Sequence, residues 1–246
     1  MKGFRFKALL VTLVLLIVVV PLASLILPNA HPLLAQVSLA VLLMAMLCAA
    51  VFAVCENRRK SMIAVALALP AIVLQGLDAV TDHTGLLGAS SICDVIFFSY
   101  VITVILRHLF LEKEVTANVI CASLCVYLLL GVAWADIYSL VDIAEGGSFS
   151  YNLGDDLATH STTRQKDKDN DSDSPDHRMR LRGQKAIYPI YFSFVTMTTL
   201  GYGDIVPRTN LSRALVSIQS VMGQLYLAVL VARLVGLHIS WSTREQ

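Results

Sequence analysis

Charged side chains are scarce in this chain, and their scarcity excludes an ordinary soluble domain. Only 15% of the 246 residues are aspartate, glutamate, lysine or arginine, whereas 56% are hydrophobic. Soluble domains carry about 25% charged residues and a smaller apolar share. The mean hydropathy of the chain is +0.68. This composition predicts a protein that crosses a membrane several times.

Groups that could carry out catalysis are few and scattered. The six histidines lie in predicted loops or at the ends of apolar runs, and no nucleophile stands at a spacing that would place it beside a base. The sequence also contains no nucleotide-binding motif and no internal duplication of the kind that many transporters carry. We therefore expect neither an enzyme nor an ATP-driven pump, and a secondary transporter is a weak alternative.

The one long hydrophilic stretch, residues 142–186, contains no cysteine. All five cysteines lie within or beside apolar runs, so no disulfide framework is indicated. Cys121 and Cys125 would share one helix face, but no histidine or carboxylate joins them there. They are interpreted as small packing residues. No cofactor is expected.

Long apolar runs, by contrast, are abundant. A bilayer core requires about 20 mostly apolar residues per helix. An apolar stretch near 187–198 is too short to cross and predicts a re-entrant helix. A cleaved signal peptide is the alternative interpretation of the first run, but its loss would leave an odd number of spans. The six predicted spans are 8–27, 33–54, 61–77 (with Pro70 inside), 86–106, 116–141 and 211–239.

The distribution of lysine and arginine predicts the orientation of these spans. Basic residues precede the first run and follow the second and the fourth, whereas the connections at 28–32 and 78–85 contain none. Because basic residues favour the cytoplasmic side of short loops, both termini are predicted to be cytoplasmic. Residues 142–186 then lie outside the cell. We expect a multi-pass protein of the plasma membrane, the inner membrane of a bacterial cell.

The outer segment changes composition abruptly between Gly154 and Lys185, where charged residues stand among serines and threonines. Such a stretch is typical of a disordered loop. Asp169, Asp171 and Asp173 alternate as in a calcium-binding loop, but the turn glycine and the closing glutamate are missing. A solvated linker is favoured.

A short loop, Thr198-Thr199-Leu200-Gly201-Tyr202-Gly203-Asp204, stands between two apolar segments. A bare cation inside a membrane needs stacked rings of oxygen atoms in place of water, and backbone carbonyls can supply them. Successive carbonyls point the same way only if alternate residues take backbone angles that glycine adopts at little cost. Gly201 and Gly203 occupy such alternate places. An ordinary turn is the alternative.

Residues 191–207 resemble the pore loop of bacterial potassium channels, with Leu200 at a position where valine is commoner. The resemblance implies a six-transmembrane channel with a single pore loop, of the voltage-gated-like potassium channel superfamily. In this family Leu200 and Tyr202 would point outward and brace the loop. The resemblance assigns the filter to Thr199, Leu200, Gly201, Tyr202 and Gly203, its support to Thr198 and Asp204, and K+ binding to Thr199, Leu200, Gly201 and Tyr202.

The same resemblance implies an all-α membrane protein that assembles as a tetramer, because one loop supplies one quarter of each oxygen ring. Trp134 and Tyr138 are predicted to anchor the outer helix at the external interface, and Asp136 is interpreted as structural, in contact with water or the outer loop. The domains expected are 1–114, a four-helix voltage-sensor-like domain, and 115–246, a pore domain. The pore domain comprises an outer helix at 115–141, a disordered turret at 142–186, a pore helix and filter at 187–207 and an inner helix at 211–239.

Gating is the least determined feature. Gly223 falls near the middle of the last span, where the resembling family uses a glycine as a gating hinge; close helix contact is the equal alternative. A voltage sensor needs several arginines in the fourth span. The only charged residue in 86–106 is Asp94, and a single arginine, Arg107, follows at the end of the span. We expect weak voltage dependence at most.

Together these patterns predict a passive potassium-selective channel, with a weakly selective cation channel as the alternative and a secondary transporter less favoured. The expected partners are three further copies of the chain, membrane lipid and K+ ions. No nucleic acid is expected.

Overall fold

The computed structural model describes residues 6–15, 18, 45–46, 48–51, 58–80, 84–112, 116–151 and 188–242. Of the first predicted span, the described part is mainly the short apolar helix Phe6–Leu15. Most of the second predicted span lies outside the described residues, as do residues 152–186 of the predicted outer loop and residue 187, the first of the predicted pore helix.

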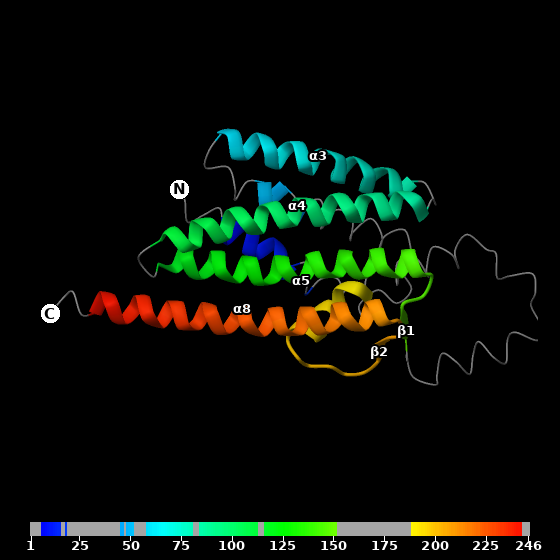
Figure 1. Cartoon of the computed structure of the whole chain (residues 1–246). Helices are drawn as coiled ribbons and strands as arrows, with labels where there is room; N and C mark the ends of the chain where they lie inside the picture. Colours follow the sequence, from blue (N-terminus) through cyan, green and yellow to red (C-terminus); the bar gives the residue numbers. More distant parts are fainter. Residues whose placement is uncertain are drawn as a thin grey trace, which may run out of the picture.

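Four helices dominate the described residues: α3 (Arg58–Val80), α4 (Thr84–Leu111), α5 (Ala117–Glu145) and α8 (Asn210–Ser242). Each is long and apolar enough to cross a membrane. They run side by side, with α4 packed between α3 and α5, and α5 between α4 and α8 (Figure 1). The chain is thus a mostly helical membrane protein. The predicted spans at 61–77, 86–106 and 211–239 each lie within one of these helices, and 116–141 does so except for its first residue, the N-cap Thr116.

The ends of α5 are fixed by local capping. Thr116 adopts an extended backbone, and its hydroxyl accepts a hydrogen bond from the Val119 amide at 3.4 Å. At the other end Gly146 takes a left-handed conformation with φ 67°, and its amide donates to the Asp142 carbonyl at 3.0 Å. Glycine adopts this conformation at little cost. The helix therefore continues four residues beyond the predicted boundary at 141.

A two-stranded antiparallel sheet is the exception to the all-helical prediction. Strand β1 (Phe149–Tyr151) pairs with β2 (Ile205–Pro207), with Ser150 opposite Val206. The Arg208 amide extends the pairing by donating to the Ser148 carbonyl at 2.8 Å. The prediction that 142–186 is disordered throughout was therefore wrong for residues 142–151. Backbone pairing with a segment more than 50 residues away cannot be seen in local composition.

Two apolar clusters form the core. The larger joins α3, α4 and α5 with the helix Phe6–Leu15, and the smaller gathers aromatic rings near β1. Trp134 and Tyr138 belong to the smaller cluster and are only 7% and 1% exposed. The prediction that they anchor the helix in lipid headgroups was therefore wrong, because both rings pack inward. The smaller cluster consists of Trp134, Tyr138, Phe149, Phe192 and Ile205.

Candidate functional site

The candidate site is the loop 198–204, which follows a short helix at residues 188–197 and leads into β2. In Figure 1 the short helix lies beside α8 in yellow. The loop turns back at the carboxyl end of that helix: the Thr198 amide donates to the Phe194 carbonyl and the Leu200 amide to the Val195 carbonyl, both at 2.9 Å. A helix too short to span is thus followed directly by irregular backbone, as predicted for a re-entrant segment.

The backbone of the loop alternates between left-handed and other angles. Positive φ occurs at Thr199 (59°), Gly201 (55°) and Gly203 (78°). The glycines were expected at two of these places. Thr199 was not, and it is the one residue other than glycine with positive φ in the part of the chain that the structure describes.

Positive φ at Thr199 has a cost, because a β-branched residue in the left-handed region is strained by about 1–3 kcal/mol. Its hydroxyl donates to the Thr198 carbonyl at 2.7 Å, which is a local compensation. Three alternate left-handed residues are the condition for aiming successive carbonyls to one side. Strain held at a single segment in this way is typical of a functional site.

The two large apolar side chains of the loop are exposed in the single chain. Leu200 is 54% exposed and Tyr202 is 68% exposed. Both were expected to brace the loop against its surroundings, and the described residues of this chain offer them little cover. A bracing surface would have to come from elsewhere.

Behind the loop, a buried hydrogen-bond network joins the short helix to α5 and α8. The Ser193 hydroxyl donates to the Gly131 carbonyl at 2.6 Å and accepts from Gln219 Nε2 at 2.7 Å. Gln219 Nε2 also lies 3.1 Å from the Ser193 carbonyl, while Gln219 Oε1 accepts from the Tyr138 hydroxyl. Ser193, Gln219 and Tyr138 are almost wholly buried. Satisfied networks of this kind fix one arrangement of the elements that share them.

Two glycines let the neighbouring helices approach the short helix closely. A Cβ on Gly131 would lie 2.5 Å from the Phe194 ring, and one on Gly223 would lie 2.7 Å from Met197 Cγ. Both glycines therefore serve close packing, which small residues permit in membranes. The proposed hinge at Gly223 is not tested by this contact, and α8 runs through it as one helix.

The carboxyl end of the loop is held by Asp204, one of the two predicted support residues. The Tyr191 hydroxyl donates to Asp204 Oδ2 at 2.7 Å, and the Ile205 amide donates to Oδ1 at 3.0 Å. Partial burial, together with the Asp204 carboxylate, raises the pKa of the Tyr191 phenol to about 12. The phenol therefore keeps its proton, and its hydrogen bond, throughout the physiological range. Thr198, the other support residue, donates to the Phe194 carbonyl at 2.7 Å.

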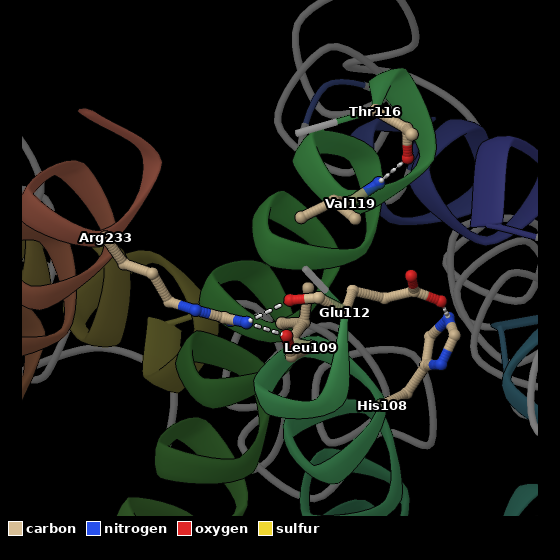
Figure 2. A network of polar contacts seen from close by, with 6 residues as sticks. All are labelled: His108, Leu109, Glu112, Thr116, Val119 and Arg233. Carbon is tan, nitrogen blue, oxygen red and sulfur yellow. Dashed lines mark hydrogen bonds and ion pairs between the residues drawn. The ribbon is translucent and has the colours of Figure 1, made fainter. Parts of the chain in front are cut away.

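At the opposite end of α8, Arg233 contacts the carboxyl end of α4. Its Nη2 donates to the Leu109 carbonyl and, at 3.1 Å, to the Glu112 carbonyl, as Figure 2 shows. The guanidinium also lies 5.1 Å from the centre of the Phe110 ring. A cation at the carboxyl end of a helix is favoured by the helix dipole and by unpaired carbonyls. The contact ties α8 to the connection between α4 and α5.

The sequence predicts the loop but not most of the residues that hold it. Gly131, Tyr191, Ser193 and Gln219 were not predicted. A glutamine within an apolar span is a signal that could have marked Gln219, because polar side chains in membranes are expensive and usually have a role. No group of three or more histidine, cysteine, aspartate or glutamate side chains that could hold a metal occurs among the described residues.

Comparison with known proteins identifies the same region. Residues 183–238 match a family model described as ion channel. This stretch takes in the short helix, the loop and most of α8. No curated protein and no solved structure matches the chain. With four helices apolar enough to span a membrane, the match supports a membrane protein with passive ion-channel activity.

Proposed function

We propose that this chain is one quarter of a potassium-selective channel whose filter is the loop 199–203. The observation that carries the proposal is the alternation of left-handed residues at Thr199, Gly201 and Gly203. Carbonyl rings that replace the hydration shell of K+ need such an alternation. K+ would be held by carbonyl oxygens of residues 199–202, with the Thr199 hydroxyl at the inner end. The family match over 183–238 supports the channel class but not the ion.

A homotetramer follows from the same chemistry, since each oxygen ring takes one residue from each of four loops. Two further observations support it. Leu200 and Tyr202 are largely exposed, and apolar residues along α8 such as Val221, Leu225 and Val229 are each more than half exposed. In the proposed assembly a neighbouring copy covers part of this surface, and lipid and the water-filled path meet the rest.

The membrane topology proposed is six spans with both termini in the cytoplasm and residues 142–186 outside. The loop would then dip in from the outer face, and α8 would line the path below it, with Gly223 as the candidate gating hinge. Voltage dependence is expected to be weak. Moving one charge through 100 mV contributes about 2.3 kcal/mol, and Arg107 is the lone arginine at the end of α4.

The proposal is tested by purifying the full chain, reconstituting it in liposomes and measuring K+ and Na+ flux separately. Flux of K+ with little Na+ flux is expected. Equal flux of both ions would favour a weakly selective cation channel instead, and uptake against a gradient would favour a transporter. A liposome preparation that is silent under every voltage and pH tested would contradict the proposal.

A further inference from the structure

Three polar side chains stand on three helices that are packed side by side. Gln75 lies on α3, Asp94 on α4 and Asp136 on α5. Helices α4 and α5 are neighbours and run in opposite directions (Figure 1). Asp94 is about 15 Å along α4 from Thr84, and Asp136 is about 14 Å along α5 from Glu145, by helical rise. The two carboxyls therefore stand at matching depths.

Gln75, Asp94 and Asp136 have more buried acceptor oxygens than hydrogen-bond donors to satisfy them. Gln75 Nε2 donates to Asp94 Oδ2 at 2.9 Å, and Asp94 is only 5% exposed. Asp94 Oδ1, Asp136 Oδ2 and Gln75 Oε1 are all buried oxygens without a hydrogen-bond partner. The Asp94 and Asp136 carboxyls also lie close enough to repel each other when both are charged. Asp136 is therefore not simply a structural residue in contact with water, as its sequence position suggested.

Among the residues that the structure describes, no ion pair joins a basic side chain to either acid. The sequence contains no lysine or arginine between residues 61 and 106 or between 114 and 163. The basic residues described on α3 and α4, Arg59, Lys60, Arg107 and His108, lie toward the far ends of those helices. On α5, Asp142 accepts a hydrogen bond from the Ser148 amide at 2.8 Å, and on α8 the buried Gln219 binds Tyr138 and Ser193.

Three other acidic or basic residues stand between Gln75 and Asp94 in the sequence. They are Asp78, Asp82 and His83, whose side chains lie outside the described residues. Two of them are acids and would add repulsion rather than remove it. His83 precedes Thr84 and is the one base among them, so it needs a test of its own.

A buried carboxylate without a counter-charge costs several kcal/mol, and two facing each other cost more. A proton removes the charge and also supplies the missing donor, because a protonated carboxyl donates one O–H. The unpartnered oxygens on Asp94 and Asp136 are the atoms that such a proton would join. We propose that Asp94 and Asp136 form a proton-binding site that links α4 to α5 inside the membrane layer.

Loss of the proton would place two like charges between these helices and weaken their packing. Because α5 packs on the short helix through Gly131, the site lies where α4 meets a helix that supports the candidate pore. A pH-dependent flux follows from this placement. That consequence rests on the proposed channel function, whereas the proton-binding site does not.

The site is tested by reacting the full chain in liposomes with dicyclohexylcarbodiimide, an apolar reagent that couples to protonated buried carboxyls. Labelled residues are located by peptide mass spectrometry over a pH series. Labelling at Asp94 or Asp136 is expected at neutral pH. Glu145 is the internal control, because it is exposed and accepts a hydrogen bond from the Ser148 hydroxyl at 2.7 Å. It should stay unlabelled at neutral pH.

A single substitution sharpens the test. D94N removes the charge that repels Asp136 while keeping a side chain of the same shape. The pH at which Asp136 loses its label should fall by about one unit or more. H83Q should leave both labelling curves unchanged. Increased labelling in H83Q would show that the histidine had been the counter-charge and would overturn the proposal.

Absence of label at both aspartates in the wild type at neutral pH would also overturn it, as would an unchanged Asp136 curve in a D94N protein that elutes like the wild type. The readout does not depend on conduction. A protein that is labelled but silent refutes the channel and keeps the proton site. A protein that conducts K+ but carries no label at either aspartate refutes the proton site and keeps the channel.

Discussion

The two sides of the pore-loop segment differ in how the chain supports them. Its back, the short helix 188–197, is fixed by the Ser193–Gln219–Tyr138 network and by close contacts at Gly131 and Gly223. Its front, residues 199–203, is exposed and holds three left-handed residues. One chain therefore completes the support of the loop but not the site itself. In the proposed channel, ions and other copies of the chain would cover the front.

The largest expected effect comes from the front, at Gly201. Replacing it by alanine places a Cβ on a residue with φ 55°, although nothing lies within 4 Å of that atom. The expected defect is therefore in backbone angle rather than in packing, and it should abolish selective K+ flux while membrane insertion is kept. Gly88→Ala on α4, where there is equal space and no positive φ, is the matched control. A Gly201→Ala protein with full selectivity would contradict the filter assignment.

The next largest effect is expected at Gly131 on α5, which lies against the short helix 188–197. A Cβ there would meet the Phe194 ring at 2.5 to 2.7 Å, so alanine must displace the short helix. Overpacking of this kind costs about 1–3 kcal/mol. We expect a lower unfolding temperature and reduced flux. Gly236→Ala on α8, with nothing within 4 Å, should change neither quantity. Equal behaviour of the two variants would show that the contact does not matter.

Gln219→Leu should have a comparable or smaller effect by a different cause. The change leaves the buried Tyr138 hydroxyl and the Ser193 hydroxyl each without one partner, at a cost of about 1–3 kcal/mol. The matched control is Gln224→Leu, because Gln224 is exposed and makes one longer hydrogen bond, 3.4 Å to the Met197 carbonyl. Thermal unfolding of the purified protein measures both. The interpretation fails if Gln224→Leu is the more damaging change.

Tyr191→Phe removes one hydrogen bond to Asp204 and keeps the ring. We expect the ratio of K+ to Na+ flux to fall by about tenfold at most, since hydrogen bonds to charged groups contribute about 1.5–3 kcal/mol when well buried and this one is partly exposed. The wild-type phenol has a pKa raised to about 12 by burial and by Asp204. Its contribution is therefore present at neutral pH and is lost only as the pH rises toward 12. A difference between variant and wild type that changed between pH 6 and pH 8 would contradict this assignment.

The smallest effect is expected at Val206, in β2 beyond the loop. It is 39% exposed and stands opposite Ser150 in β1. An aromatic ring near a pore mouth can hold a quaternary ammonium ion. Val206→Tyr should strengthen block by external tetraethylammonium without changing selectivity. An unchanged blocking constant would place Val206 away from the ion path.

Local patterns were enough to predict the helices and the loop. The spans follow from apolar runs, and the glycines at 201 and 203 follow from the angles that a carbonyl ring requires. The support of the loop could not be predicted because its partners are far apart in sequence. Tyr138 and Gln219 are 81 residues apart, and Gln219 and Ser193 are 26 apart. The left-handed Thr199 was missed for another reason: propensity argues against it, and only the surrounding fold overrides that preference.

The contact between Arg233 and α4 is made to peptide oxygens rather than to side chains. Substitutions at Leu109 or Glu112 would therefore leave both acceptors in place. An insertion or deletion before them would not, because it would rotate and shift the last turn of α4 relative to α8. The contact between α8 and α4 therefore depends on the length of α4 and not on which side chains stand at residues 109 and 112.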